Sequence, residues 1–265
     1  MKISQVIEIL ENWAPPQYAE EYDNVGLIIG NPTNDITGIL ICLDSLEMTI
    51  REAKSLNCNL IVAHHPILFK GLKKINGTNY VQRTVIDAIR NDIAIYALHT
   101  NLDNIITGVN KKIADKLNLS QQHILSAKHT TLPVSETIGS GIMGQYTKPV
   151  KMEFFLRLLK QNMDLQVLKH TTLCKDQISK VAVCGGSGSF LIPSAIKEKA
   201  DVFITSDLKY HEFFDADGQL VLMDIGHFES EKFTVDLIEE YLIHYLPSQL
   251  IHKTQCQTNP VQYFI

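Results

Sequence analysis

The chain has 265 residues, of which 45% are hydrophobic and 20% are charged, and its formal net charge is −5. Because nucleic-acid-binding domains carry clustered positive charge, this acidic balance does not indicate a nucleic-acid partner. No apolar run approaches the roughly 20 residues of a membrane-spanning helix, so we expect no membrane partner either. The length is sufficient for one large domain or two smaller ones.

The first residues are predicted to form a helix and not a signal peptide. Apolar residues recur at helical spacing from Ile3 to Trp13, and Pro15 and Pro16 stop the pattern. The five cysteines include no C-x-x-C pair, and Cys42 and Cys184 lie inside apolar runs. We therefore expect buried, reduced thiols and a cytoplasmic location.

Short apolar runs alternate with amphipathic stretches along the first part of the chain. Strands are expected at 38–43, 59–65 and 93–100, and helices at 46–57, 79–91 and 108–119. This strand–helix order predicts a mostly parallel sheet covered by helices.

The pattern changes between about 124 and 180, where the sequence is more polar. Residues 135–147 predict a turn-rich strand pair, and 151–163 a helix. The first rhythm then returns, with strands at 180–186, 201–207 and 219–226, a helix at 190–200, and a last helix from about Glu229 to Tyr245. We expect an α/β fold of two similar halves with mostly parallel sheets. The expected divisions are an N-terminal half (1–123), a connecting segment (124–180) and a C-terminal half (181–265).

Histidines and acidic residues follow four of the predicted strands. They are His64 and His65, His99 with Asp103, Asp207 with His211, and His227 with Glu231. In open parallel sheets, ligand sites form at the carboxyl ends of strands. The members of the last three pairs are four residues apart, so each pair shares one face if its segment is helical.

The His64-His65-Pro66 stretch is the most informative of these. Neighbouring residues on a regular strand point to opposite faces. Pro66 stops the hydrogen-bonding ladder, so both imidazole rings can lean into one crevice at the strand end. A single buried histidine is usually a hydrogen-bonded core residue, but two adjacent ones are harder to explain in that way.

Each remaining residue also has a structural interpretation. Asp103 is equally typical of a helix cap or a turn. The helix dipole favours Glu231 in an exposed first turn, and this explains the His227–Glu231 pair as well as ligation does. His99 could orient a metal ligand instead of binding an ion itself.

Histidine and carboxylate side chains without cysteine suit two borderline or hard divalent ions. The set consists of His64, His65, Asp103, His227 and Glu231. Two divalent ions carry more positive charge than two carboxylates neutralise. The remaining charge favours hydroxide and an anionic small-molecule ligand such as a phosphate.

Two loops have less specific signals. Gly186, Ser187 and Gly188 lie between a predicted strand and helix and could present backbone N–H groups to an anion. Their stretch matches neither the dinucleotide nor the P-loop pattern, and a tight turn is the simpler explanation. Asp23 and Asn24 could reach a site or cap their own turn.

Six motifs occur in order along nearly the whole chain. They are Asp-Asn-Val-Gly-Leu (23–27), Ala-His-His-Pro (63–66), His-Thr-Asn-Leu-Asp (99–103), Gly-Ser-Gly-Ser-Phe (186–190), Asp-Leu-Lys-Tyr-His (207–211) and Gly-His-Phe-Glu-Ser-Glu (226–231). In these motifs the sequence resembles the Nif-three-like dinuclear metal family, the GTP cyclohydrolase I type-two-like proteins. It resembles the short form, which lacks an inserted middle domain. Tyr22, Ser206 and Phe228 depart from the family pattern, but none is a predicted ligand.

The resemblance implies a metal site in the cleft between the two halves and a toroidal homohexamer. It also implies that His64 and His227 hold one ion, that His65 and Asp103 hold the other, and that Glu231 bridges both. The two divalent ions per subunit could be Zn, Fe, Mn, Co or Ni.

The expected function is a metal-dependent, GTP cyclohydrolase-like hydrolase of a nucleotide-like or phosphorylated small molecule. Metal-bound hydroxide would be the nucleophile, and His99 or His211 would transfer protons. A non-enzymatic role in metal handling, cofactor assembly or regulation fits the same five ligands. A soft-metal carrier would usually show exposed Cys or Met clusters, which favours the hydrolase. A purely structural metal is least expected, because structural zinc sites are closed and rich in cysteine.

Overall fold

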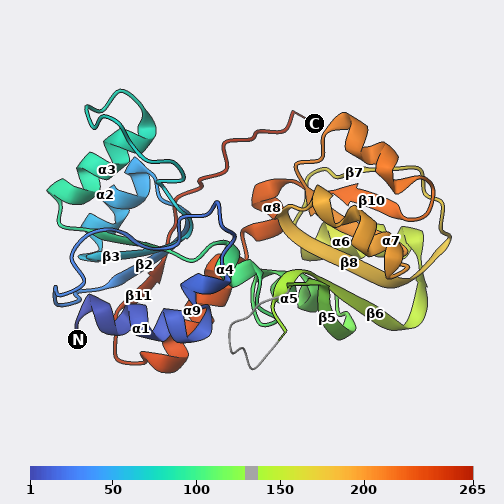
Figure 1. Cartoon of the computed structure of the whole chain (residues 1–265), viewed down its shortest axis with the longest axis horizontal. Helices are drawn as coiled ribbons and strands as arrows, with labels where there is room; N and C mark the ends of the chain where they lie inside the picture. Colours follow the sequence, from blue (N-terminus) through green and yellow to red (C-terminus); the bar gives the residue numbers. More distant parts are fainter. Residues whose placement is uncertain (129–136, 265) are drawn as a thin grey trace. The chain divides into compact units, whose positions relative to one another are not determined.

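The computed structural model describes residues 1–128 and 137–264 (Figure 1). The chain forms two compact units: unit 1 consists of Met1–Leu102 and Thr234–Pro260, and unit 2 of Asp103–Phe233 and Val261–Ile265. Each unit has its own sheet and its own apolar core. The predicted α/β architecture of two halves is confirmed.

A five-stranded sheet forms the centre of unit 1. Its strands, in spatial order, are β1 (Gly26–Ile29), β4 (Ala94–Ala97), β3 (Leu60–His65), β2 (Ile39–Asp44) and β11 (Ile251–Lys253). Only β1 is antiparallel to its neighbour. The three central strands are almost fully buried, as expected for parallel strands with helices on both faces.

Helices cover both faces of this sheet. They are α1 (Ile3–Trp13), the short 3-10 helix η1 (Pro16–Tyr18), α2 (Glu47–Ser55), α3 (Tyr80–Arg90), α4 (Thr100–Asp103) and α9 (Thr234–Tyr245). α2 and α3 pack on one face, whereas α1 and α9 lie on the other, where Trp13 stacks on Tyr241 with ring centroids 4.1 Å apart (Figure 1). The start of α3 has a local cause, because the Asn79 side chain accepts a hydrogen bond from the Gln82 N–H.

Unit 2 contains a six-stranded sheet. Its spatial order is β5 (Ser120–Ala127), β6 (Gly139–Lys151), β8 (Gln177–Ser187), β9 (Val202–Ser206), β10 (Val221–Asp224) and β7 (Lys169–His170). β8, β9 and β10 are parallel, and the other pairings are antiparallel. The sheet is therefore mixed and not mostly parallel, because the segment 124–180 supplies β6, β7, the second half of β5 and the start of β8.

The helices of unit 2 also lie on both faces of its sheet. They are α5 (Val109–Lys116), α6 (Met152–Asn162), the 3-10 helix η2 (Ser189–Leu191), α7 (Ile192–Lys197), the 3-10 helix η3 (Tyr210–Ala216) and α8 (His227–Glu231). Phe155 and Leu159 of α6 pack in one core, and Ala195 of α7 in another on the opposite face. Three parallel strands thus end beside short loops and short helices, where the site residues lie.

Two expectations about organisation need correction. The single helix expected from Glu229 to Tyr245 is two helices, because α8 ends at Glu231 and α9 begins at Thr234. The units also differ from the predicted divisions at 123 and 180. β11 pairs in parallel with β2, so the chain after Phe233 returns to unit 1. The first two residues of the predicted strand pair 135–147 lie outside the described residues, and 139–151 form the single strand β6.

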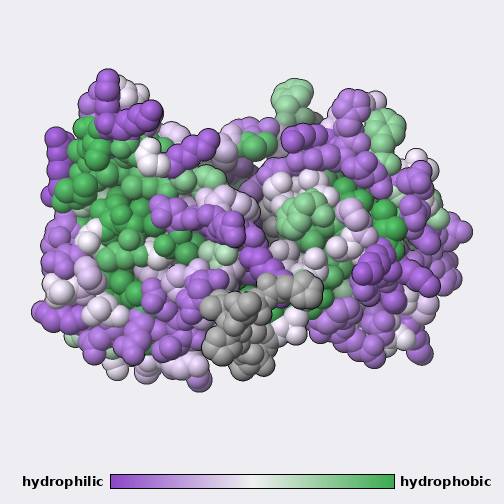
Figure 2. All heavy atoms as spheres, viewed as in Figure 1, coloured by the Kyte–Doolittle hydropathy of each residue, from purple (hydrophilic) through white to green (hydrophobic). Residues whose placement is uncertain are grey.

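Apolar side chains reach the surface over the α2–α3 side of unit 1 (Figure 2). Large exposed side chains on and before α3 include Ile75, Tyr80 and Ile89. None of the described helices combines the length and apolar character needed to cross a membrane. Cys42 and Cys184 are buried free thiols, as expected, whereas Cys174 is exposed.

Candidate metal centre

His64 and His65 close β3 in unit 1. The ladder between β2 and β3 pairs Asp44 with His65, and β3 ends there before Pro66. The two ring centroids are 4.8 Å apart, so the rings lie side by side although the residues are consecutive. His64 is fully buried, and the His65 side chain is 22% exposed. The strand end therefore brings both imidazoles to one place, as the sequence predicts.

A third imidazole joins them from the neighbouring strand. His99 follows β4, and its ring centroid lies 5.4 Å from that of His64 and 5.5 Å from that of His65. One ring nitrogen of each histidine lies within 4.8 Å of the others. Zinc–nitrogen bonds are about 2.0–2.1 Å long, so small side-chain adjustments could bring these atoms onto one ion. Unit 1 alone therefore brings three imidazole nitrogens within 4.8 Å of one another.

Each of the three rings is held at Nδ1 by an oxygen acceptor. His64 Nδ1 lies 2.8 Å from the Leu98 carbonyl oxygen, His65 Nδ1 2.8 Å from Asp44 Oδ1, and His99 Nδ1 2.8 Å from Asp23 Oδ1. Because carbonyls and carboxylates only accept hydrogen bonds, each Nδ1 carries a proton. In a neutral ring, Nε2 then carries the lone pair, which is the state a metal-ligating histidine needs.

The two carboxylates that hold His65 and His99 are ionised. Burial acts to raise the pKa of Asp23, but hydrogen bonds from His99, Thr100 and Asn24 lower it to about 2. Burial likewise acts to raise the pKa of Asp44. The bonds from His65 and from Thr258, 2.6 Å away, outweigh that effect and lower it. Both groups are therefore negative at neutral pH. Asp23 reaches the site, which decides between the two interpretations of its loop.

His227 and Glu231 form the corresponding group in unit 2. They lie one turn apart on α8, and His227 Nε2 is 3.0 Å from Glu231 Oε2. His227 Nδ1 is 2.6 Å from Asp207 Oδ2. Burial acts to lower the pKa of His227, but its bonds to Asp207 and Glu231 raise it to about 11. The ring is therefore an imidazolium between two carboxylates, and an ion at Nε2 would have to replace a proton.

Asp207 and Asp224 set the position of this group. Asp207 follows β9 with φ +58°, a left-handed conformation that is costly for a residue with a side chain. The hydrogen bond from His227 lowers the pKa of Asp207. Asp224, buried at the end of β10, accepts hydrogen bonds from the Leu208 and Gly226 N–H groups at 3.2 and 3.0 Å. It thus connects the loops that carry Asp207 and His227. Sequence reasoning missed this role, although an Asp at a strand end was a signal for it.

The glycine-rich loop lies against Glu231. Gly186 has φ +62°, and a Cβ atom at this position would overlap Glu231 Oε1. Its N–H donates to Ser230 Oγ at 2.9 Å, and the Gly185 N–H donates to Asn110 Oδ1 at 2.9 Å. The Gly186 amide is therefore already used within the protein. Anion binding by Ser187 and Gly188 stays a prediction.

Asp103 and His211 have different surroundings. Asp103 ends α4 and belongs to unit 2. Burial, followed by the charges of Asp103 and Glu231, raises the pKa of the Cys184 thiol, so both carboxylates lie in the neighbourhood of this thiol. His211 is exposed on η3, with its ring centroid 5.2 Å from that of Tyr210. The predicted pairing of Asp207 with His211 is replaced by the hydrogen bond that His227 Nδ1 donates to Asp207 Oδ2.

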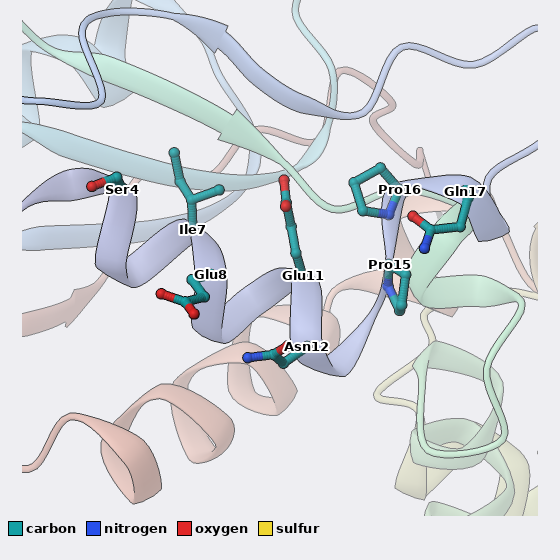
Figure 3. Close-up of a pocket in the computed structure, with 8 residues that line it drawn as sticks. All are labelled: Ser4, Ile7, Glu8, Glu11, Asn12, Pro15, Pro16 and Gln17. Carbon is teal, nitrogen blue, oxygen red and sulfur yellow. The ribbon is translucent and has the colours of Figure 1, made fainter. Parts of the chain in front are cut away.

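Another pocket of unit 1 lies on α1 and η1 (Figure 3). Its lining residues are Ser4, Ile7, Glu8, Glu11, Asn12, Pro15, Pro16 and Gln17. None of the predicted metal ligands lines it. Glu11 Oε1 lies 3.3 Å from the buried Tyr96 hydroxyl, which donates to it. The histidine and carboxylate groups described above remain the candidate centre.

Known proteins resemble this chain in sequence and in fold. A Clostridium perfringens protein named "GTP cyclohydrolase 1 type 2 homolog" is 35% identical over 232 residues, covering 87% of each chain. A Lactococcus lactis protein of the same name is 33% identical over 98% of both chains. The crystal structure of a Bacillus cereus protein related to NIF3 matches with a TM-score of 0.89 at 24% identity. That match covers 100% of this chain and 99% of the other, and it supports the fold.

The chain also matches a whole protein family over almost its full length. The profile of Duf34/NIF3 (NGG1p interacting factor 3) matches residues 1–260. The resemblance recognised in the six sequence motifs is thereby confirmed. The chain belongs to the Duf34/NIF3 family.

Proposed function

We propose that this protein binds two divalent metal ions and hydrolyses a nucleotide-like or phosphorylated small molecule. One observation carries the proposal. His64, His65, His99 and His227 are all fixed at Nδ1 by an oxygen acceptor. This is the arrangement by which metalloproteins orient their imidazole ligands through Nε2. Four rings held in the same way are more than core packing requires.

The residues fit a pair of divalent ions. His64 and His227 would hold one ion, His65 and Asp103 the other, and Glu231 would bridge them. This assignment requires the ligands of the two units to meet at one cleft. Imidazole and carboxylate donors without a thiolate suit Zn, Mn, Fe, Co or Ni, and geometry and supply would select among these metals.

The side chains of the protein would divide the remaining work. When bound, a pair of divalent ions supplies Lewis acidity and an activated water. Asp44 and Asp207 keep His65 and His227 in their ligating orientations. Of the two predicted acid–base residues, His99 has the fixed orientation, because Asp23 holds its Nδ1. His211 is exposed and would serve only if substrate brings it into reach.

Two observations support the proposed substrate class: the charge of the ligand set and the names of the related proteins. The positive charge of two divalent ions exceeds the negative charge of Asp103 and Glu231. The centre would therefore attract an anion such as a phosphate. The relatives named as homologues of a GTP cyclohydrolase make GTP the first compound to test. The alternative is a non-enzymatic role in metal handling, cofactor assembly or regulation with the same ligands.

Metal analysis combined with a substrate panel tests the proposal. Wild-type protein, reconstituted with each metal, should hold two ions per chain and turn over a member of a nucleotide and phosphoester panel. Glu231→Ala should lose both properties. Glu153→Ala is the matched control, because Glu153 pairs with Arg157 on an exposed face of α6. Wild-type protein that binds no metal would contradict the site. Metal binding without turnover would contradict the hydrolase and favour the alternative.

We further propose the homohexamer that the family resemblance implies. Gel filtration should give a mass about six times the 29.9 kDa of one chain. Elution at the mass of one chain would contradict this assembly.

A further inference from the structure

The Asp23-Asn24 pair lies in the loop before β1 and has no part in the ligand set proposed above. The Asp23 side chain is fully buried. Its Oδ1 accepts hydrogen bonds from His99 Nδ1 and from the Asn24 N–H, each at 2.8 Å. Its Oδ2 accepts bonds from the Thr100 N–H at 3.1 Å and from the Thr100 hydroxyl. Both carboxylate oxygens are therefore occupied by donors.

Only an ionised carboxylate satisfies all of these donors. The two backbone N–H groups cannot reverse their hydrogen bonds, and one of them faces each oxygen of Asp23. A neutral carboxyl or a carboxamide carries a hydrogen of its own, which would face one of these N–H donors without an acceptor between them. Four partners thus hold Asp23 as a two-sided acceptor, and this leaves His99 Nδ1 as the donor in their shared bond.

Asn24 makes a complementary contact on the other side of the loop. Its Nδ2 donates to the Leu68 carbonyl oxygen at 2.5 Å. Leu68 lies three residues after His65, in the segment that follows Pro66. The neighbouring residues Asp23 and Asn24 therefore fasten two segments of unit 1: the one after β4 that carries His99, and the one that follows β3.

We propose that Asp23 is a positioning residue that fixes His99 with its proton on Nδ1 and its lone pair on Nε2. One ring nitrogen of His99 lies within 4.8 Å of a ring nitrogen of His64 and of His65. Because Asp23 occupies Nδ1, Nε2 is the nitrogen that is left to act as an acceptor. An acceptor at this place can take a proton from a bound water or substrate. Its use in catalysis rests on the proposed function, whereas the tautomer is a property of the metal-free protein.

The exchange Asp23→Asn makes a sharp test, because it removes one acceptor and adds one donor at nearly constant volume. The carboxamide oxygen can face only one of the two backbone N–H groups. It should face that of Thr100, because Thr100 is buried, whereas Asn24 is exposed and its N–H can turn to water. The new NH2 group then faces His99 Nδ1 and forces that atom to accept. The proton moves to Nε2, and the lone pair turns away from His64 and His65. An equivalent exchange at a catalytic histidine–aspartate pair is known to act through the wrong tautomer.

The experiment is ¹⁵N NMR of histidine-labelled, metal-free protein at a pH where the rings are neutral, with His99→Gln to assign the signal. In wild type the His99 proton should be on Nδ1, and in Asp23→Asn on Nε2. Asn24→Asp is the matched variant, because it removes the donor to Leu68 but leaves Asp23 intact, and its His99 tautomer should remain that of wild type. Asp35→Asn removes a carboxylate from an exposed ion pair with Lys2 and therefore controls for the loss of one negative charge.

Three results would overturn the inference: a wild-type proton on Nε2, no change in Asp23→Asn, or the same change in Asn24→Asp. The wild-type spectrum decides even if Asp23→Asn fails to fold. Titration of the same wild-type sample with Zn²⁺ separates this inference from the proposed function. A protein with the expected tautomer that binds no ion would contradict the metal centre alone.

Discussion

The two units build their histidine groups by the same construction but with different neighbours around the anchored ring. In unit 1, His65 at the end of β3 is held by Asp44 at the end of the neighbouring strand β2. In unit 2, His227 after β10 is held by Asp207 after the neighbouring strand β9. Adjacent parallel strands end at the same edge, so an Asp on one readily reaches a histidine on the next.

The difference lies in what surrounds each anchored ring. His65 has two further imidazoles beside it, His64 and His99. His227 has a second carboxylate, Glu231, and this keeps it protonated in the metal-free protein. Unit 1 thus offers nitrogen lone pairs, and unit 2 offers negative charge. A pair of divalent ions needs both, since neutral ligands alone leave the ionic charge uncompensated.

Removing the charge of unit 2 should have the largest effect. Glu231→Ala is expected to lower the affinity for both ions, because Glu231 is the proposed bridge. The loss should exceed the roughly 10–100-fold that follows from removing a residue that only orients a ligand. Isothermal titration with Zn²⁺ and metal analysis would measure this. A variant that still binds one ion at wild-type affinity would show that Glu231 does not bridge.

Single changes in unit 1 should be more selective. His64→Gln and His65→Gln are each expected to lower the metal content from two ions per chain to about one, since each ring is assigned to a different ion. Spectroscopy of cobalt-loaded variants would show whether the remaining sites differ. Identical spectra for the two variants would mean that both histidines serve the same ion.

Gly186 tests how tightly unit 2 packs around its carboxylate. Gly186→Ala adds left-handed strain of about 1–2 kcal/mol and a methyl group that overlaps Glu231. Gly218→Ala is a close control, because Gly218 has nearly the same φ, +66°, with no atom within 4 Å of the added Cβ. We expect thermal unfolding at a lower temperature for both variants, and weaker metal binding only for Gly186→Ala. Equal metal affinity in the two variants would contradict a role for this close contact.

The smallest effect concerns pH. The pKa of His227 in the folded, metal-free protein is about 11, above the ordinary value of 6.5. Its stabilising effect is therefore complete below pH 6.5 and is lost as the pH rises through about 11. Urea unfolding at several pH values should show a steeper loss of stability for metal-free wild type than for His227→Gln. The exposed His244→Gln should follow wild type. Parallel curves for wild type and His227→Gln would contradict the carboxylate–imidazolium arrangement.

Periodicity and residue chemistry were sufficient for much of the fold. The apolar runs at 38–43 and 59–65 predicted β2 and β3, because a parallel strand buried on both faces must be apolar along its whole length. The His64-His65-Pro66 stretch marked a strand end for a steric reason that is local to the chain. The break after Glu231 was missed, since residues 229–245 contain no proline or glycine to signal it.

The sequence could not identify hydrogen-bond partners that are distant along the chain. Asp23 lies 76 residues from His99, Asp44 lies 21 residues from His65, and Asp207 lies 20 residues from His227. Each Asp is also a reasonable turn residue, so local pattern alone could not assign it.

The sequence by itself determined which side chains can ligate and which strands carry them, because these depend on residue type and on local periodicity. Only the tertiary structure decided which carboxylate holds which ring, and therefore which nitrogen carries the proton. Strand order sets those pairs, and strand order follows from the packing of the whole sheet.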